Sequence, residues 1–340
     1  MGKYEDCRIL IVGAGSMGII MGYDLQLAGA QVTFLIRPHR VEALKHPQKL
    51  YSYDDHQLKI YTGYKYITSP AEIVGAAYDY IVITLDGAAL RNEVGQKLTK
   101  TIGEAVQNTK TKVILGTVFI NIRSWFLETS GLASDQVVSG QLITHIYPTN
   151  AVTLPVHPPT NEKLLAEADH AYTDCLGSGF TVSNSSAAGA NDFAELWNAS
   201  GVSTCDVVSQ EQLSLTSTAL FPLLAVCELL DWPNFQNFDT TGELWGLATA
   251  AVREIQGLSM HGTIGQQAAA STTEAGLAQV FAGIGSTMLP MDWPAFNRYH
   301  HGNKVNAQDR ELLRAAIACG EAEGKSMSAV KELLHRVELA

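Results

Sequence analysis

Short apolar runs alternate with helix-forming stretches over the first half of the chain. Four runs are rich in β-branched residues and have few polar interruptions, namely Arg8–Val12, Gln31–Ile36, Tyr80–Leu85 and Lys112–Leu115. Runs of this kind are typical of strands in a parallel sheet that is covered by helices on both faces. The stretch Gly18–Ala28, between the first two runs, is expected to be a helix. The pattern predicts the α/β class with a doubly wound parallel sheet.

From about residue 186 the strand pattern ends and long helical stretches follow. The predicted helices cover Gln210–Leu230, Thr241–Leu258, Glu274–Phe281, Phe296–His301 and Asn306–Glu323. Ser178–Gly189 is rich in Ser, Gly and Asn and is the predicted hinge. A chain of 340 residues is long enough for two domains. We therefore predict an α/β domain over residues 1–185 and an all-α domain over residues 186–340.

Composition narrows the class of partner. Apolar residues make up 46% of the chain and charged residues 17%, which is enough for a large core. The net charge of −11 argues against nucleic acid, because phosphate binding requires a basic face. The five cysteines are scattered without metal-site spacing, so we expect reduced thiols, a cytoplasmic protein and no metal. No uninterrupted apolar run is long enough for a bilayer, so the expected partner is a small molecule and not a membrane. The apolar C-terminal helices could also bury a homodimer interface.

The first predicted strand runs directly into a glycine-rich turn. Its residues, Gly13-Ala14-Gly15-Ser16-Met17-Gly18, have the spacing G-x-G-x-x-G between a strand and a helix. Gly13 allows the tight turn, Gly15 lets the backbone approach a pyrophosphate, and Gly18 lets the helix pack close to the strand. The N–H groups at the helix start, from Ser16 and Met17 onward, favour a phosphate. The sequence therefore predicts a Rossmann-type dinucleotide site.

Basic residues follow the second predicted strand. A site that prefers NAD usually carries Asp or Glu here to accept a hydrogen bond from the ribose 2′-hydroxyl. This chain has Arg37 and Arg40 instead. Two guanidinium groups can bind a 2′-phosphate, so we predict NADPH as the cofactor.

Four ordered motifs resemble the ketopantoate reductase family. They are Ile11–Gly18, Asp79–Leu85, Phe221–Leu224, and Gly285–Leu289 followed by Tyr299–Gly302. The resemblance implies a Rossmann domain, a helical C-terminal domain and a substrate cleft between them. It also adds Thr84 and Leu85 to the expected cofactor-binding residues.

The chain departs from the family at the residues that carry its chemistry. Asp86 stands where the family has a lysine, and Asn121 lies about two positions late for the family's asparagine. The family's catalytic lysine falls at Gln212 or Leu213, or at Glu195 in an alternative alignment, and its substrate-binding glutamate falls at Phe296. Reduction of a ketone builds negative charge on oxygen, which a nearby ammonium group stabilises. We therefore expect a function other than ketopantoate reduction.

Two functions of different classes remain open. The first is an NADPH-dependent biosynthetic reductase of a small substrate with a C=N iminium or C=O group. For this reaction Asp86, Asn121, Tyr299 and His301 are the candidate catalytic residues, because the Asp86 carboxylate would stabilise an iminium cation. Asp86 could equally be a helix N-cap, and Tyr299 and His301 could be solvated helix residues. The second function is a non-redox, pericyclase-like cyclase or isomerase that uses the same cleft. A nucleotide sensor without catalysis is a third option.

Overall fold

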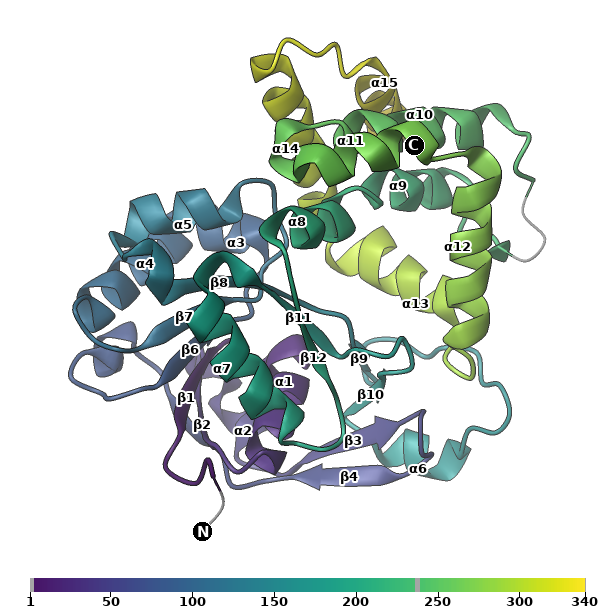
Figure 1. Ribbon diagram of the computed structural model, residues 1–340. Helices are drawn as coiled ribbons and strands as arrows, with labels where there is room; N and C mark the ends of the chain where they lie inside the picture. The colour runs from purple at the N-terminus through teal and green to yellow at the C-terminus, as the bar shows by residue number, and fades with distance from the viewer. Residues whose placement is uncertain (1–2, 236–238, 340) are drawn as a thin grey trace. The chain divides into compact units, whose positions relative to one another are not determined.

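A computed structural model describes residues 3–235 and 239–339 (Figure 1). The chain forms two compact units, one from Met1–Thr153 with Pro159–Gln210 and the other from Leu154–Pro158 with Glu211–Ala340. The predicted boundary after residue 185 is therefore too early. The segment after it completes the sheet of the first unit with a helix, α7 (Ala187–Asn198), and an edge strand, β12 (Cys205–Val208).

The first unit is built on an eight-stranded sheet with the order β12-β11-β8-β7-β6-β1-β2-β5. Besides β12, the strands are β1 (Arg8–Val12), β2 (Gln31–Leu35), β5 (Lys65–Ile67), β6 (Tyr80–Ile83), β7 (Lys112–Leu115), β8 (Val137–Leu142) and β11 (Phe180–Ser183). All neighbours pair in parallel except β8 and β11. The predicted α/β class with a Rossmann-type sheet is confirmed, and all four predicted strands are present in it.

A second, four-stranded sheet belongs to the same unit. Its order is β4-β3-β10-β9, with β3 (Gln48–Ser52), β4 (Leu58–Tyr61), β9 (His145–Pro148) and β10 (His170–Thr173). The last two residues of β9, Tyr147 and Pro148, pair with β10.

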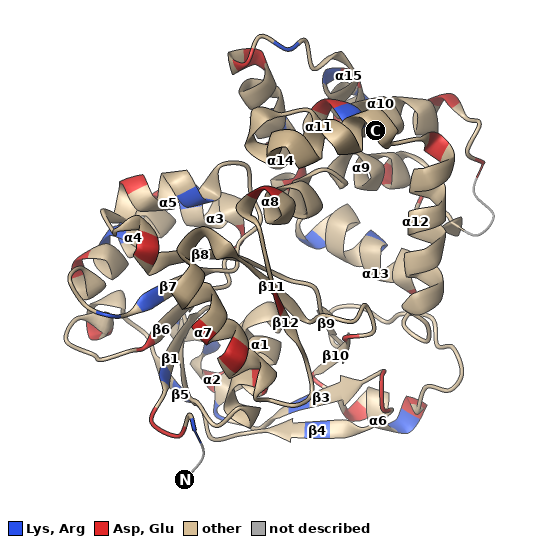
Figure 2. Ribbon diagram, viewed as in Figure 1, with Lys and Arg blue, Asp and Glu red and all other residues tan. Residues whose placement is uncertain are grey.

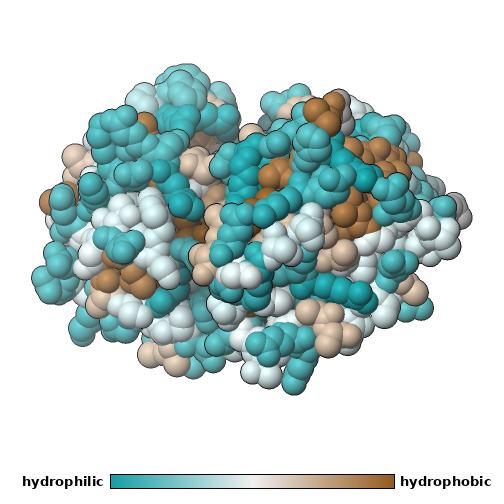
Figure 3. Space-filling model, turned by 90° about the horizontal axis from the view of Figure 1, so that it is seen from above, coloured by the Kyte–Doolittle hydropathy of each residue, from teal (hydrophilic) through white to brown (hydrophobic). Residues whose placement is uncertain are grey.

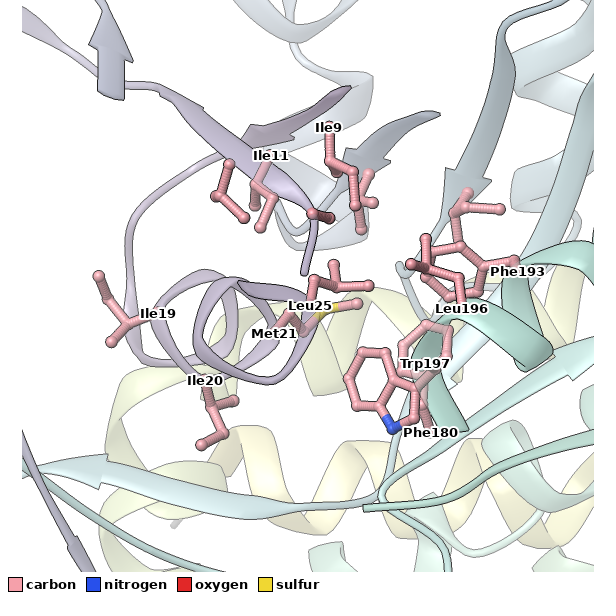
Figure 4. Close-up of a cluster of buried hydrophobic side chains, with 14 of the residues drawn as sticks. Ile9, Ile11, Ile19, Ile20, Met21, Leu25, Phe180, Phe193, Leu196 and Trp197 are labelled. Atoms are coloured by element: carbon pink, nitrogen blue, oxygen red, sulfur yellow. The ribbon is translucent and has the colours of Figure 1, made fainter. Parts of the chain in front are cut away.

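Helices cover both faces of the eight-stranded sheet. The helices of the first unit are α1 (Ser16–Leu27), α2 (Val41–Leu44), α3 (Gly87–Arg91), α4 (Glu93–Val106), α5 (Ile122–Ser130), α6 (Glu162–Glu167) and α7, of which α6 lies beside β3 of the smaller sheet. Figure 4 shows the core on one face, where Ile9, Ile11, Met21, Leu25, Phe193 and Trp197 meet. Trp197 is fully buried and stacks on Phe180 with ring centroids 5.1 Å apart. That indole therefore belongs to the core, not to a substrate site.

The second unit is helical in its described residues, apart from a single bridge between Val156 and Met291. Its helices are α8 (Gln210–Thr218), α9 (Phe221–Leu229), α10 (Glu243–Gln256), α11 (Gly262–Ser271), α12 (Glu274–Thr287), α13 (Trp293–Tyr299), α14 (Asn306–Ala322) and α15 (Ser328–Leu339). The single helix predicted over Gln210–Leu230 is in fact two, since Pro222 lies in the first turn of α9 and a new helix begins there. Buried Trp245, Phe281 and Trp293 form the aromatic part of the core.

One stretch of the second unit, Gln210–Leu229, is long and apolar enough to cross a membrane by length and composition alone. Half of its most apolar window is buried inside the protein, and the core helix of a soluble protein passes the same test. The stretch is also divided between α8 and α9. It is therefore weak evidence for a membrane span.

Acidic residues outnumber basic ones in the sequence, 34 to 23. Figure 2 shows the two signs interspersed over the helices and loops of each unit, and Figure 3 shows a face that is largely hydrophilic with separate apolar patches.

A buried histidine in the second unit links its stability to pH. His261 is fully buried at the end of the turn Ser259–His261, and its Nε2 lies 3.5 Å from Oγ1 of Thr218. Burial lowers the pKa of His261 to about 4, from an ordinary value of 6.5. Between these two values the unfolded chain binds a proton that the folded chain does not. The free energy of unfolding therefore falls as the pH falls through this window.

We predict that His261→Gln flattens this pH dependence. The wild-type protein should lose about 3 kcal/mol at most between pH 6.5 and 4 from this residue. The variant should lack that slope, even if its stability at pH 7.5 differs. Thermal unfolding of both proteins at several pH values between 7.5 and 4.5 checks this, with exposed His335→Gln as the control. Parallel curves for wild type and His261→Gln would contradict it.

Candidate dinucleotide site

The turn between β1 and α1 has two positions that exclude any side chain. Gly13 has φ +107°, and a Cβ added there would lie 2.8 Å from Oγ1 of Thr84. A Cβ on Gly18 would lie 2.1 Å from the carbonyl oxygen of Gly13. The first position requires glycine for its backbone conformation and the second for the close approach of α1 to the end of β1.

The middle glycine of the motif faces open space. Gly15 is exposed and extended, and a Cβ added there would meet no atom within 4 Å. In the described residues, no side chain caps α1 and no acidic residue lies in its first turn. The N–H groups at the start of a helix have no partner inside the helix and carry its positive dipole end. The turn is therefore shaped to receive a phosphate over Gly15, Ser16 and Met17.

This turn lies at the switch point of the sheet. The chain passes from β1 to β2 on one side, whereas β6, β7 and β8 follow on the other side of β1 (Figure 1). Ligands of open α/β sheets bind beyond the carboxyl ends of the strands at such a point. Thr84 ties two of these ends together, because its Oγ1 donates to the carbonyl oxygen of Val12 at 2.8 Å. The next strand end is tied in by Thr117, whose Oγ1 donates to the carbonyl oxygen of Leu85 at 2.8 Å.

The two predicted arginines lie beside the glycine turn. Arg37 and Arg40 are exposed at the two ends of the short turn that follows β2. Nη2 of Arg40 lies 3.5 Å from the carbonyl oxygen of Ala14, so its guanidinium group reaches back to the motif. This contact places a positive charge next to the turn.

Asp86 is the N-cap of α3. Its Oδ1 accepts a hydrogen bond from the N–H of Ala89 at 2.7 Å, and the residue is exposed. Of the two interpretations of Asp86, the structure therefore contains the cap, with the charge still at the surface.

Next to Asp86 the structure shows a side-chain contact that no pattern in the sequence predicted. A Cβ on Gly87 would lie 2.6 Å from the Phe119 side chain, and the Arg91 guanidinium lies 5.0 Å from the centre of the Phe119 ring. This cation–π contact joins α3 to the loop after β7. Asn121, at the end of that loop, is exposed with φ +56° and makes no cap hydrogen bond to α5. A left-handed conformation is one that Asn adopts more readily than most residues, so this position has a conformational reason for Asn.

The remaining candidates lie in the second unit. Tyr299 ends α13, and burial raises the pKa of its phenol. His301 lies in the turn after α13, and its Nδ1 is 2.7 Å from Oδ2 of Asp309. Phe296, at the position of the family's glutamate, is buried and stacks on His300.

The positions expected for the family's lysine carry no replacement charge on α8. Leu213 is buried and Gln212 is exposed. In the alternative alignment, Glu195 lies on α7 in the first unit and pairs with Lys3 at 2.9 Å. Glu195 is thus a surface ion-pair residue.

Comparison with known proteins agrees with this architecture. Residues 9–121 match the family model described as ketopantoate reductase PanE/ApbA. The 2-dehydropantoate 2-reductase from Geobacter metallireducens GS-15 is 17% identical with a TM-score of 0.66, over 98% of this chain and 99% of that one. A PanE/ApbA family ketopantoate reductase from Ralstonia eutropha JMP134 is 15% identical with a TM-score of 0.64, over 98% and 97%. A ternary structure of D-mandelate dehydrogenase with NADH and anilino(oxo)acetate is 14% identical with a TM-score of 0.67, over 98% and 97%.

Residues 9–121 therefore resemble the ketopantoate reductase PanE/ApbA family, and the chain as a whole has the fold of these solved structures. The expected resemblance is confirmed. No curated protein sequence matches the chain at a significant level.

We predict that two glycines of the turn have different roles, Gly15 in nucleotide binding and Gly18 in the stability of the fold. Gly15→Ala places a methyl group where the phosphate would lie but touches no protein atom, so Tm should change by less than about 2 °C while the Kd for NADPH rises about tenfold or more. Gly18→Ala should cost about 2–4 kcal/mol, because its methyl group would overlap the Gly13 carbonyl.

Thermal unfolding and a fluorescence titration with NADPH check both effects. Gly283→Ala on α12 is the control, since a Cβ there also meets no atom within 4 Å but the position is outside the motif. If Gly15→Ala binds NADPH as tightly as the wild type, the phosphate does not lie on this turn.

Proposed function

We propose that the protein binds NADPH on the first unit and reduces a small organic substrate with a C=O or C=N iminium group. The observation that carries the proposal is the open space over Gly15, beside an uncapped helix start, together with the Arg40 guanidinium, whose Nη2 lies 3.5 Å from the carbonyl oxygen of Ala14. Such a site combines backbone donors for a pyrophosphate with a cation for a 2′-phosphate. The D-mandelate dehydrogenase that shares the fold has been solved with NADH, which supports a nicotinamide cofactor.

The two acceptor groups differ in what they require. A carbonyl takes a hydride at carbon and a proton at oxygen, so its reduction requires a proton donor. An iminium cation takes only the hydride and becomes a neutral amine. Asp86 favours the cation by its charge, but the carboxylate is already hydrogen-bonded at the start of α3. Its effect on a bound cation is therefore weakened, and the carbonyl stays open as the acceptor.

A non-redox cyclase or isomerase is the second candidate, and one observation favours it. Leu213, one of the alternative positions for the family's lysine, and Phe296, at the position expected for its glutamate, are both buried. Apolar groups at these positions would suit a reaction in which the protein only holds a reactive substrate in one conformation. In that case the substrate would be converted without oxidation of NADPH.

We predict that Arg40→Ala raises the Kd for NADPH about tenfold or more, and that Arg37→Ala acts in the same direction. The loss of one charge-assisted contact to a phosphate has this size, about 1.4 kcal/mol. NADH has no 2′-phosphate, so its Kd should change less than about twofold. Fluorescence titrations with both nucleotides check this, with Lys45→Ala on the same segment as the control. An equal loss for NADPH and NADH would exclude the assignment of a 2′-phosphate to these arginines.

We predict that Asp86→Asn distinguishes the two acceptor classes. Asn is as good an N-cap as Asp, so α3 should persist while the charge is lost. Reduction of a cyclic iminium should slow about tenfold, whereas reduction of a ketone should not slow. The measurement is transfer of deuterium from C4-deuterated NADPH to the product, with a panel of ketones and cyclic iminium ions. NADPH binding without label transfer to any member, together with conversion of an unsaturated substrate at constant NADPH, would favour the non-redox candidate.

A further inference from the structure

The first unit has a large groove at the edge of its main sheet opposite the glycine turn. Its volume is about 1040 Å³, and all of its lining residues belong to this unit. The lining includes Cys7 before β1, Tyr80 at the start of β6, Lys112 at the start of β7 and Gln136 before β8. These four parallel strands are neighbours in the sheet, so at about 4.8 Å per strand the groove crosses roughly 14 Å of its amino edge.

Two helices end beside this groove. α4 ends at Val106 and α5 at Ser130, and residues 107–110 and 131–133, which follow them, are part of the lining. The two helix ends are packed tightly, because a Cβ added to Gly103 would overlap the carbonyl oxygen of Ser130. Within their described residues, neither helix has a basic side chain in its last turn. Since the C-terminal end of a helix carries a partial negative charge, this edge of the sheet favours a cation, whereas the start of α1 at the other edge favours an anion.

Carboxylates gather where the groove passes β1 and β6. Asp6, Asp79 and Asp192 line it together with the phenol of Tyr80. Burial raises the pKa of Tyr80, and the nearby charges of Asp192 and Asp79 raise it further. Asp79 accepts a hydrogen bond from the N–H of Arg8 at 2.8 Å. Asp6 and Asp192 form no hydrogen bond or ion pair in the part of the chain that the structure describes, so neither carboxylate is neutralised by a cation there.

The lysines of the lining do not balance these charges. Nζ of Lys112 donates to the carbonyl oxygen of Asp135 at 3.0 Å and lies 3.5 Å from Oδ2 of the same residue. Lys110, the second lysine, is exposed. The lining contains four aspartates and two lysines, so its net charge is −2. The side chains therefore favour a cation, as the helix ends do.

A buried amide adds an acceptor at the end of the groove next to β8. Gln136 is 7% exposed, and its Nε2 donates to the carbonyl oxygens of Val106 and Thr109 at 3.2 and 3.3 Å. These bonds fix the orientation of the amide, and its Oε1 accepts no hydrogen bond from the described residues. Buried amide oxygens normally have a hydrogen-bond partner. A donor in the groove would supply the missing one.

The occupant that suits this groove is an organic cation and not a metal ion. The described residues contain no group of three or more His, Cys, Asp or Glu that could hold a metal. The acceptors are instead spread along the sheet edge, with carboxylates and the Tyr80 ring towards one end and the Gln136 amide and the helix ends towards the other. Ammonium groups bind carboxylates and aromatic rings, and methylene chains pack on apolar surface. A linear polyamine carries several ammonium groups on one methylene chain.

We propose that this groove binds a linear organic polyamine, which places one ammonium group among Asp6, Asp79 and Asp192 and another beside Gln136 at the ends of α4 and α5. The inference goes beyond the proposed function, because the groove lies at the other edge of the sheet from the nucleotide. No covalent step is involved. Binding stabilises the folded unit by mass action and does not require NADPH.

A titration with spermidine tests whether the groove takes a polyamine. Isothermal titration calorimetry of the full chain at about 20 mM salt should give one site with a Kd below roughly 1 mM, and the affinity should fall about tenfold at about 200 mM salt. Mg²⁺ at the same concentration should not displace spermidine. Absence of binding at the lower salt concentration would overturn the proposal, and so would displacement by an equal concentration of Mg²⁺.

Charge changes inside and outside the groove test its location. Asp192→Asn should raise the Kd for spermidine about fivefold or more. The matched control is Asp206→Asn, which removes the same charge from an exposed position on β12 of the same unit and should change the Kd less than about twofold. Equal effects of the two variants would overturn the proposal, since the polyamine would then be held by the overall charge of −11.

A variant with the opposite effect keeps the test independent of folding. Lys110→Gln removes a like charge from the lining and should lower the Kd for spermidine about threefold, which a damaged fold would not do. An unchanged or higher Kd in this variant would overturn the proposal. Both groove variants should bind NADPH with the wild-type Kd. A protein that binds spermidine in this way but does not bind NADPH would contradict the proposed function and leave this inference intact.

Discussion

The close approach of helix α1 to the end of strand β1 is the contact on which the rest of the first unit depends. At Gly18 the helix lies so near the strand that a methyl group would overlap the Gly13 carbonyl oxygen, at 2.1 Å. This packing directs the start of α1 at the carboxyl edge of the sheet, and it leaves the space over Gly15 open. The Thr84 hydroxyl then fixes the neighbouring strand end to the same turn. One steric requirement thus determines both the strand–helix geometry and the position of the proposed phosphate site.

Features encoded within a few residues were predicted from the sequence, and features made by distant residues were not. The apolar runs and the glycine motif gave the parallel sheet and its turn because each is a local pattern. β12 was missed because it is a short edge strand with exposed Asp206 and Val207, which lacks a continuous apolar run. The four-stranded sheet was missed because its strands are paired by chain contacts such as Leu50 with His170. Pairing over such a separation leaves no trace in a local window.

The same division applies to the candidate site. The glycine motif and the two arginines after the second strand were picked out by residue types at expected spacings, and the structure places Arg40 beside the turn. The partner of Phe119 could not be predicted, since Arg91 stacks on it from another element. The partner of His301 could not be predicted either, because it is the π-turn His300–Lys304 that brings His301 next to Asp309. For Asp86, the sequence left a cap and a catalytic carboxylate equally open, and only the hydrogen bond to Ala89 identifies the cap.

Leu213, one of the alternative positions for the family's lysine, is part of the packing of the second unit. Leu213 is 4% exposed, so a lysine at this position would bury an ammonium group among apolar neighbours. A buried ammonium without a partner is costly and tends to lose its proton, so a single reversal would not restore the family's lysine in working form. Phe296, also buried, is stacked on His300 and is likewise part of the packing. If the protein reduces a ketone, as we propose, the proton must come from a group other than these two side chains.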